Sequence, residues 1–326
     1  MRPQVRALFR RLVGDTAYLL LSFPTAVIGF SVLLTLFVGG IGTIAVWVGL
    51  PVLTLCLLLA RGFADLQRGW LPSVLGRDVV RPRYPSPPEG AGPVRRLLHP
   101  LTIGQSWLDL LHGLVLFPVS ILTFVITVTW WLLTAGTLGY PLYGWITAAI
   151  PGNTELPEVL GLGSGYLVNS AFYVTCGVLF GLLLFPVVRG SALVQASLGR
   201  VMLTGVAELR ERIIEAAVRM AKAVNYRSLG TFEFLVDIET GSFAFIEANP
   251  RLQVEHTITE EVTGVDLVRA QLQLAAGETL ETLGLRQQDI SRPNGYAIQL
   301  RVNMETMDAQ GNIRPAGGTL HTFEPP

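Results

Sequence analysis

Charged residues are scarce in this chain of 326 residues: 15% of it is charged, while 50% is hydrophobic and the mean hydropathy is +0.49. Globular proteins carry about 25% charged residues, so this composition excludes a disordered chain and an ordinary cytosolic protein. Basic and acidic residues number 24 each, and they cancel to a net charge of zero. No overall positive field would attract nucleic acid, and we predict no nucleic-acid partner.

Cysteine is nearly absent, since Cys56 and Cys176 are the only two and both lie in apolar runs. This argues against a structural disulfide and against a zinc site. Acidic residues are unevenly spread: residues 1–204 hold 7 of the 24 and residues 205–326 hold the other 17. Such an asymmetry indicates two unlike pieces. We therefore predict two domains, 1–204 and 205–326.

Long uncharged runs fill the first domain, at residues 17–60, 110–154 and 159–188. A helix crosses the roughly 30 Å hydrocarbon core in about 20 residues. The first run predicts two spans that turn near Gly39–Gly42. The second predicts one span at about 110–133, followed by an interfacial aromatic segment, and the third predicts the fourth span.

The basic residues predict the orientation. Four Lys or Arg precede the first span, seven lie in residues 61–96 and the remaining thirteen begin at Arg189. None lies in the two other turns, so the positive-inside rule places both termini and the central loop in the cytoplasm. We predict a plasma-membrane protein with four spans and lipid as a partner. No charged residue is expected inside a span, which argues against an ion pathway.

Short motifs repeat between the two pairs of spans. The repeated motifs are Phe23-Pro24 with Phe117-Pro118, Arg61-Gly62 with Arg189-Gly190, and Leu75-Gly76-Arg77 with Leu198-Gly199-Arg200. They predict two helical hairpins that each enter and leave from the cytoplasm. Together with the Pro-rich linker 81–93, this pattern resembles the sensor domain at the N-terminus of actinobacterial sensor histidine kinases, over about residues 10–204.

An ordinary kinase of that type would carry a phosphoacceptor histidine in a dimerisation helix, followed by an ATP-binding domain. The four histidines are His99, His112, His256 and His321. Three of them lack an acidic-flanked helical context. His256 follows Glu255, but Pro250 upstream breaks any long helix. We therefore predict that this chain is not an ordinary histidine kinase.

The period of the hydrophobic pattern changes after residue 206. Residues 207–224 predict an amphipathic helix. Residues 230–237 and 242–248 alternate with a period of two and predict a hairpin with its loop at 239–241. That register places Glu233 opposite Glu247.

Two opposed carboxylates about 5 Å apart destabilise a hairpin unless something bridges them. Carboxylate oxygens and nearby Asn249 suit Mg²⁺ or Mn²⁺ held jointly with nucleotide phosphates. The alternative is that Glu233 and Glu247 both point to solvent at a sheet rim.

The segment 249–256 would place Asn249, Arg251, Gln253 and Glu255 on one side of an extended backbone. Arg251 would hold a small planar anion with two hydrogen bonds, while Glu255 would take a proton from it.

Helix and strand signals continue toward the C-terminus. Thr257 and Glu260 predict a capping box, and Asp266 predicts a cap for a helix over 267–276. A strand over 296–303 would carry Arg301.

Residues 245–256, FIEANPRLQVEH, and 259–266, TEEVTGVD, resemble biotin carboxylase, the ATP-grasp component of acetyl-CoA, propionyl-CoA and pyruvate carboxylases. The resemblance covers about residues 207–326. It implies that Glu233, Glu247 and Asn249 bind Mg-ATP. It further implies a bicarbonate site at Arg251, Gln253 and the backbone of Val254, a base at Glu255, and an enolate-stabilising side chain at Arg301. The implied cofactors are ATP with Mg²⁺ or Mn²⁺, and biotin; the implied partner is a biotin carboxyl carrier domain.

The chain departs from that family before residue 205, where the membrane region replaces the N-terminal domain, the Gly-rich lid and the strands with nucleotide-binding lysines. Lys222 is the only lysine, and the chain stops at Pro326 within the family's last domain. The predicted fold is a four-helix transmembrane domain followed by an incomplete α+β ATP-grasp fragment. Whether the chain is an enzyme stays open at this stage.

Three interpretations follow from this combination. The chain is a membrane sensor-like protein with a carboxylase half-site that is inactive alone, or an enzyme half that a second chain completes, or a chimera. The chimera would join the N-terminus of a two-component sensor kinase to the biotin carboxylase subunit of an acyl-CoA or pyruvate carboxylase. The switch near Gly205 falls inside a family domain rather than at a linker, which favours the first or the third interpretation.

Overall fold

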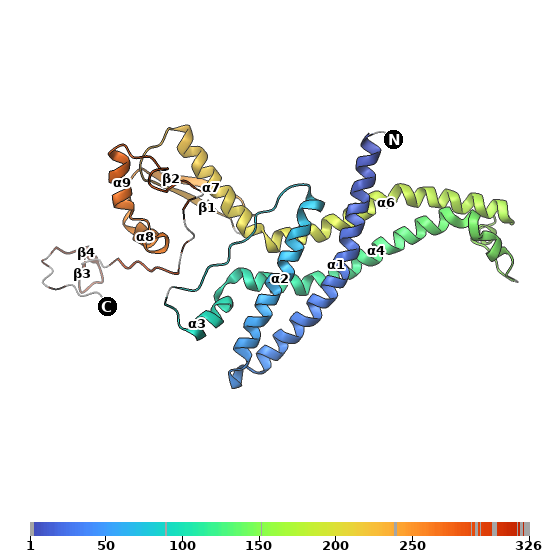
Figure 1. Ribbon diagram of the computed structural model, residues 1–326, viewed down its shortest axis with the longest axis horizontal. Helices are drawn as coiled ribbons and strands as arrows, with labels where there is room; N and C mark the ends of the chain where they lie inside the picture. The colour runs from blue at the N-terminus through green and yellow to red at the C-terminus, as the bar shows by residue number, and fades with distance from the viewer. Residues whose placement is uncertain are drawn as a thin grey trace. The chain divides into compact units, whose positions relative to one another are not determined.

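The computed structural model describes residues 3–88, 90–150, 152–237, 240–287, 289–290, 293, 295–301, 305–317, 319 and 322. The chain forms two compact units, residues 1–224 and 225–326 (Figure 1). Each unit is described by itself. The boundary expected at residues 204 and 205 stays a prediction.

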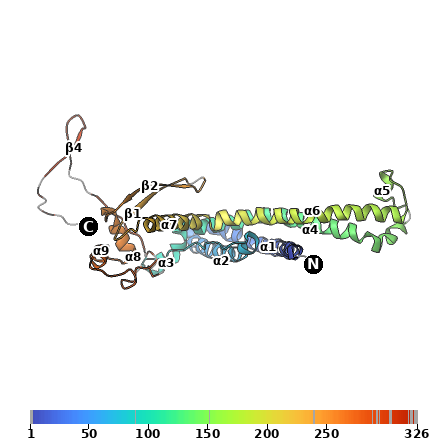
Figure 2. The ribbon, with the colours of Figure 1, turned by 90° about the horizontal axis from the view of Figure 1, so that it is seen from above.

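Four long helices make up most of the first unit: α1 (Pro3–Gly42), α2 (Gly49–Leu75), α4 (Gly104–Ala148) and α6 (Tyr166–Leu203). All four are long and apolar enough to cross a membrane, which agrees with the four predicted spans. They form two hairpins, α1–α2 and α4–α6, and α4 and α6 lie side by side in both views (Figures 1 and 2).

The helices extend beyond the predicted spans. Helix α4 continues through Gly136 and Pro141 to Ala148, without a break at the aromatic segment that was expected to follow residue 133. A proline lacks only one backbone donor, and a long helix tolerates that loss. Helix α6 begins at Tyr166 rather than at residue 159, because a turn with positive φ at Gly161, Gly163 and Gly165 precedes it.

Shorter elements connect and extend the hairpins. The connections contain the 3₁₀ turns Ile44–Val46 and His99–Thr102 and the helices α3 (Pro93–Leu98) and α5 (Leu156–Val159). Helix α7 (Gly205–Ala223) follows α6 and agrees with the amphipathic helix predicted at 207–224.

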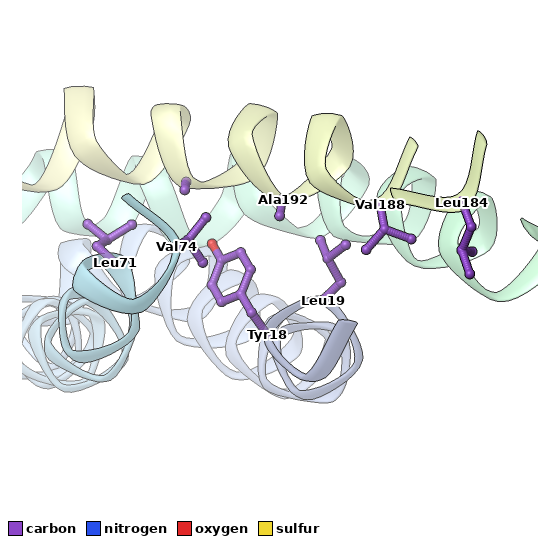
Figure 3. Packing of buried hydrophobic residues seen from close by; sticks show 8 residues of the cluster. Tyr18, Leu19, Leu71, Val74, Leu184, Val188 and Ala192 are labelled. Atoms are coloured by element: carbon purple, nitrogen blue, oxygen red, sulfur yellow. The ribbon is translucent and has the colours of Figure 1, made fainter. Parts of the chain in front are cut away.

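Two apolar clusters hold the first unit together. The first, in Figure 3, brings Tyr18 and Leu19 of α1 and Leu71 and Val74 of α2 against α6. The α6 members of this cluster are Leu184, Val188, Ala192 and Ala196. Small alanines on α6 face large side chains on α1 and α2, so the helices approach closely. The second cluster joins α1, α2 and α4 through Leu33, Cys56, Leu57, Ala60 and Leu110.

The predicted repeat has a structural counterpart in two aromatic pairs. Phe23 stacks on Phe124 with ring centroids 4.2 Å apart and planes at 18°, and Phe30 stacks on Phe117 at 4.3 Å and 17°. Phe117 follows Phe23 by 94 positions, and Phe124 follows Phe30 by the same 94. Exchanging each phenylalanine with its counterpart therefore converts one stacked pair into the other. Helices α1 and α4 are therefore related by an internal pseudo-two-fold axis.

The second helices of the hairpins repeat with a different shift. Arg189 and Gln195 follow Arg61 and Gln67 by 128 positions, and Gln67 and Gln195 both donate to the Ser22 hydroxyl. The predicted equivalence of residues 75–77 with 198–200 is wrong in three dimensions. Gly76 ends α2 with a φ of +71°, whereas Gly199 lies inside α6.

The second unit begins with the predicted hairpin. Strands β1 (Thr231–Val236) and β2 (Phe243–Asn249) are antiparallel, with Glu233 opposite Glu247 and a register shift directly after Glu233. Gly241 has a φ of +64°, as the turn requires, while Glu239 of the predicted loop lies outside the described residues.

Two short helices follow a 3₁₀ turn at Val254–His256: α8 (Thr257–Thr263) and α9 (Leu267–Ala275). The predicted cap on α9 is confirmed, because Asp266 Oδ1 accepts from the Arg269 amide at 2.8 Å. The predicted capping box is wrong. The Thr257 hydroxyl donates backwards to the Val254 carbonyl, and Glu260 accepts from the Leu267 amide.

The strand expected at 296–303 does not form over residues 296–301, and residues 302 and 303 lie outside the described part. A strand needs a hydrogen-bonding neighbour, and no described strand lies beside this segment. A small unpredicted hairpin, β3 (Glu305–Met307) and β4 (Ile313–Pro315), follows. Its turn rests on Asp308 Oδ1, which accepts from the amides of Gln310 and Asn312.

Candidate functional site

The paired strands of the second unit bring two carboxylates to one amide. Glu233 on β1 and Glu247 on β2 are opposed, and Asn249 ends β2. The Asn249 Nδ2 atom donates to Glu233 Oε1 at 3.0 Å and to Glu247 Oε1 at 2.9 Å. Asn249 is 8% exposed, so the shared donor lies in a largely desolvated position. Three of the predicted site residues therefore lie together, and the amide moderates the repulsion between two like charges.

These three side chains have the right chemistry for a hard divalent cation. Mg²⁺ and Mn²⁺ prefer carboxylate and carbonyl oxygens, and Mg²⁺ is usually held by one or two carboxylates together with substrate phosphates. In the described part of the chain, no group of three or more His, Cys, Asp or Glu side chains could hold a metal ion. A cation between these two carboxylates would therefore need further oxygen ligands from a bound molecule.

The segment after β2 bends instead of remaining extended. The Arg251 amide donates to the Asn249 carbonyl at 2.8 Å, and Glu255 lies in the 3₁₀ turn Val254–His256. The prediction that Asn249, Arg251, Gln253 and Glu255 form one row on an extended backbone is therefore wrong. A bend and a tight turn interrupt the two-residue alternation on which that row depended.

Gln253 differs from its neighbours because its Oε1 atom is buried and has no hydrogen-bond partner. An unsatisfied buried acceptor costs about 1–3 kcal/mol. A ligand that brings an O–H or N–H group would remove this cost. The side chain thus suits the bicarbonate site that the resemblance to biotin carboxylase implies there, since bicarbonate carries one hydroxyl.

Glu255 and Arg301 meet although their backbones are distant in sequence. Arg301 Nη2 lies 3.5 Å from Glu255 Oε2, and both side chains are about half exposed. Gln299 Nε2 donates to the Val254 carbonyl at 3.0 Å and fastens the segment 296–301 beside the turn. The predicted base and the predicted enolate-stabilising side chain are therefore neighbours.

His256 supports the site, a role that its sequence context did not predict. Its Nε2 atom lies 2.8 Å from Thr231 Oγ1 and its Nδ1 atom 3.1 Å from Thr259 Oγ1. It connects the turn that carries Glu255 to β1 on one side and to α8 on the other. This connection holds the turn against the strand that carries Glu233.

A second polar cluster, in the helices of the first unit, was not predicted. Arg68 on α2 and Asp109 on α4 form an ion pair, and both side chains are 0% exposed. Tyr84, in the linker after α2, donates to Asp109 Oδ2, and Arg68 donates to the Tyr84 hydroxyl. Burial, together with the hydrogen bond to Asp109, raises the pKa of Tyr84 above its ordinary value. The phenol therefore keeps its proton as a donor.

A related pair joins α1 to α6, where Arg189 Nη1 lies 3.0 Å from Asp15 Oδ1. The uncharged runs predict no charged residue within a span, but α1, α2, α4 and α6 continue past those runs and include these four charges. The repeat could have revealed the two carboxylates, because Asp109 follows Asp15 by the same 94 positions that separate the phenylalanines.

Comparisons with known proteins divide the chain at the end of α6. Residues 18–203 match the family described as "Putative sensor". Residues 203–283 match the family described as "Carbamoyl-phosphate synthase L chain, ATP binding domain". A sensor domain is thus joined directly to a biotin carboxylase fragment of the ATP-grasp type, as the two resemblances implied.

The relatives of the second part are carboxylases. The chain is 53% identical over 117 residues to pyruvate carboxylase from Aspergillus niger and 51% identical over 116 residues to mitochondrial pyruvate carboxylase from Homo sapiens. Each match covers 36% of this chain and 10% of the relative. A solved structure, the biotin carboxylase domain of a single-chain bacterial carboxylase, is 56% identical over 31% of this chain and 25% of that chain, with a TM-score of 0.28.

The chain spans about a tenth of the length of these curated relatives. The sensor match, in contrast, extends over more than half of the 326 residues and includes most of α1 and all of α2, α4 and α6. The chain belongs to this sensor family and carries a biotin carboxylase fragment after its last long helix.

Proposed function

We propose that this protein is an integral plasma-membrane protein with a sensor-like domain, which carries the metal and bicarbonate half of a biotin carboxylase site and is inactive as a carboxylase by itself. The observation that carries the proposal is the Asn249 amide shared by Glu233 and Glu247. It assembles the family's metal-binding side chains on a hairpin that follows a sensor domain.

Four long apolar helices and the distribution of Lys and Arg support membrane insertion. Many side chains on these helices face outward, such as Leu132 and Leu182, which are 67% and 70% exposed. Lipid tails are the environment in which such a surface is stable. From the distribution of the basic residues we propose that both termini and the linker 76–92 are cytoplasmic. The carboxylase fragment then lies on the cytoplasmic side.

The family chemistry supplies the roles proposed for the half-site. A bound Mg²⁺ or Mn²⁺ would neutralise charge on ATP, and Glu233, Glu247 and Asn249 would hold it. Arg251, Gln253 and the backbone of Val254 would bind bicarbonate, and Gln253 Oε1 would accept its hydroxyl hydrogen. Glu255 would take the bicarbonate proton, and Arg301 would stabilise the biotin enolate.

Positioning of ATP is the step that this chain does not supply. The family's Gly-rich lid and lysine-bearing strands would come before the fragment, where this chain has its sensor domain. Lys222 is the only lysine, and it lies exposed on α7. Phosphoryl transfer depends on alignment of the phosphates, so a half-site has no route to activity. A biotin carboxyl carrier domain and a second chain that completes the ATP site are the partners we propose.

The test is bicarbonate-dependent ATP hydrolysis by the full chain in lipid nanodiscs, with Mg²⁺ and free biotin present. We expect no activity above that of the matched Glu255→Gln variant. Hydrolysis that depends on bicarbonate and disappears in Glu255→Gln would contradict the inactive half-site. ATP binding without hydrolysis would favour completion by a second chain.

The chimera is a second candidate, and one observation favours it: the two family matches meet at residue 203, where α6 ends and only Thr204 separates it from α7, rather than at a linker. In that case the halves would act separately, as the N-terminus of a sensor kinase and as a carboxylase subunit. Mass spectrometry of the membrane fraction distinguishes the two. Detection of the tryptic peptide 201–210, which crosses the junction, rejects separate proteins, whereas flanking peptides in separate membrane and soluble fractions would support them.

A further inference from the structure

The two halves of the sensor domain use their charges differently. Arg189 is the repeat counterpart of Arg61, and Asp15 is the counterpart of Asp109. Between α1 and α6, Arg189 donates to both carboxylate oxygens of Asp15, at 3.0 and 3.2 Å. At the equivalent place between α2 and α4, Asp109 forms its ion pair with Arg68 instead of Arg61. The internal symmetry is therefore broken at one carboxylate.

Arg61 lies close to Asp109, the residue equivalent to the Asp15 with which Arg189 pairs. Its Nε and Nη2 atoms donate to Ser106 Oγ at 3.0 and 2.7 Å, and Ser106 precedes Asp109 by three residues on α4. Residues three apart on a helix lie about one turn from each other. The Arg61 guanidinium also lies 4.3 Å above the ring of Tyr84, whose hydroxyl donates to Asp109. Among the described residues, Arg61 forms no ion pair of its own.

Arg68 does more than neutralise Asp109. Its Nε atom donates to the Leu203 carbonyl at 3.2 Å. Gln105, which donates to Asp109 Oδ1 at 3.0 Å, also donates to the Met202 carbonyl at 3.2 Å. The last carbonyls of a helix have no partner within the helix. The Asp109 cluster thus satisfies the end of α6, directly before α7 begins.

Arg68 would also keep a partner without Asp109. Its Nη1 atom already lies 2.8 Å from Asp65 Oδ1, and the Asp65 side chain is 54% exposed. Breaking a buried pair is costly when it leaves a charge uncompensated. If Arg61 takes Asp109 and Arg68 turns toward Asp65, both arginines and both carboxylates remain paired.

We propose that Asp109 exchanges between Arg68 and Arg61, and that this exchange switches the junction of α6 and α7. In one state, Arg68 holds Asp109 and the Leu203 carbonyl. In the other, Arg61 holds Asp109 as Arg189 holds Asp15, and Arg68 releases Leu203. Tyr84 contacts both arginines, with its ring 4.3 Å from Arg61 and 5.9 Å from Arg68. Its place in the linker lets movement of the linker bias the exchange.

Two facts favour an exchange over a static bond. Arg61 donates to Ser106, one helical turn before Asp109 on α4, so a second arginine lies close to the carboxylate that Arg68 holds. The junction of α6 and α7 is also well ordered by its contacts: Thr204 is 1% exposed and donates to Glu208, which pairs with Arg200. Release of one carbonyl therefore changes a tightly packed position rather than a loose one.

The first test is hydrogen exchange of the full chain in nanodiscs, comparing wild type with Arg61→Gln. This variant leaves the resting pair of Arg68 and Asp109 intact and deletes the alternative partner. We expect exchange of the amides at 203–208 to slow at least threefold. If Arg61 only stabilises α4 through Ser106, exchange there will be unchanged or faster, and the proposal is overturned. Arg95→Gln, in the exposed part of α3, is the matched control and leaves exchange unchanged.

The second test is a double-mutant cycle of Arg61→Gln and Arg68→Gln, measured by unfolding of the full chain in mixed micelles. Because each arginine replaces the other, we expect the double variant to lower the folding equilibrium constant at least tenfold more than the product of the single effects. Multiplicative effects overturn the exchange. An Arg68→Gln variant that fails to fold, while Arg68→Gln/Asp109→Asn folds, overturns it as well, because Arg61 then did not take over the carboxylate.

Discussion

The two units use the same kind of interaction in opposite surroundings. In the first unit, the side chains of Arg68 and Asp109 are both 0% exposed. In the second unit, Arg301 and Glu255 are 61% and 49% exposed and 3.5 Å apart. Loss of one partner from a buried pair leaves a desolvated charge, whereas an exposed charge regains water. The first pair therefore determines structure, and the second is available for a ligand.

Apolar packing differs in the same direction. Two buried clusters join α1, α2, α4 and α6. In the second unit, the buried residues within the described part are Asn249 and Ala270, while Leu235 and Ile246 on the strands are 67% and 56% exposed. An isolated two-stranded sheet is marginal in water without a second layer. We infer that the first unit carries most of the stability of the chain.

The largest expected effect comes from Asp109→Ala. This change removes the buried carboxylate to which Arg68, Tyr84 and Gln105 all donate, and we expect a loss of about 3–5 kcal/mol in the free energy of unfolding. Glu255→Ala, which removes one partner of an exposed pair, is the control and should cost at most about 1 kcal/mol. Both are measured by unfolding of the full chain in mixed micelles. Equal losses would contradict the difference between the two units.

Close helix contact in the first unit gives the second prediction. A Cβ at Gly177 on α6 would lie 2.7 Å from Leu138 Cγ and 2.8 Å from the Leu138 backbone nitrogen on α4. Backbone cannot move aside as a side-chain tip can, so Gly177→Ala should cost about 1–3 kcal/mol. Gly190→Ala on the same helix meets nothing within 4 Å and should be neutral or slightly stabilising. The same unfolding assay checks both variants, and a neutral Gly177→Ala would show that α4 and α6 are packed more loosely.

Sequence patterns predicted the features that depend on neighbours along the chain. The four apolar helices, the register of Glu233 with Glu247 and the cap at Asp266 follow from hydropathy, alternation and local hydrogen bonding. The capping box at Thr257 and the strand at 296–303 were wrong, because a competing acceptor and the absence of a described neighbouring strand decided them.

The pairing of Arg68 with Asp109 was out of reach for a different reason. It joins two hairpins that are separated by a linker, and periodicity carries no information about which faces of distant helices meet. The repeat of Asp15 at Asp109 is a signal in the sequence, but it indicates the wrong arginine, since the counterpart of Arg189 is Arg61. The repeat suggests a pair of Arg61 with Asp109, whereas the packing of the helices brings Arg68 to Asp109.

The third prediction concerns the amide between the two carboxylates in the second unit. Asn249→Ala removes the amide that donates to both Glu233 and Glu247 and leaves like charges opposed, so the hairpin should lose about 1–2 kcal/mol of stability. Hydrogen exchange of the amides at 231–236 measures the effect. Millimolar Mg²⁺ should restore part of the protection, and Glu233→Gln/Asn249→Ala should not respond to Mg²⁺. Protection that ignores Mg²⁺ in the single variant would exclude a cation between these carboxylates.

The smallest effect should occur at Glu155, which lies between α4 and α6. It tests whether the structural importance of a charge depends on its burial or on the unit to which it belongs. Burial raises the pKa of this carboxyl, but hydrogen bonds outweigh burial and hold the pKa below its ordinary value of 4.5. The donors are Thr147, Tyr173, Tyr140 and Asn153. A lowered pKa means that the stabilisation is complete above about pH 4.5 and is lost as the pH falls through the lower folded-state value.

We therefore expect local hydrogen exchange at 152–165, corrected for its intrinsic pH dependence, to quicken below pH 4.5 without global unfolding. Glu155→Gln should abolish this dependence, and Glu158→Gln, at an exposed position of the adjoining helix α5, should retain it. Loss of the entire first unit at the same pH would show that Glu155 acts like the buried pair of Asp109. A local response instead places Glu155 with the exposed charges of the second unit, because a carboxylate that can return to water carries little structure wherever it lies in the chain.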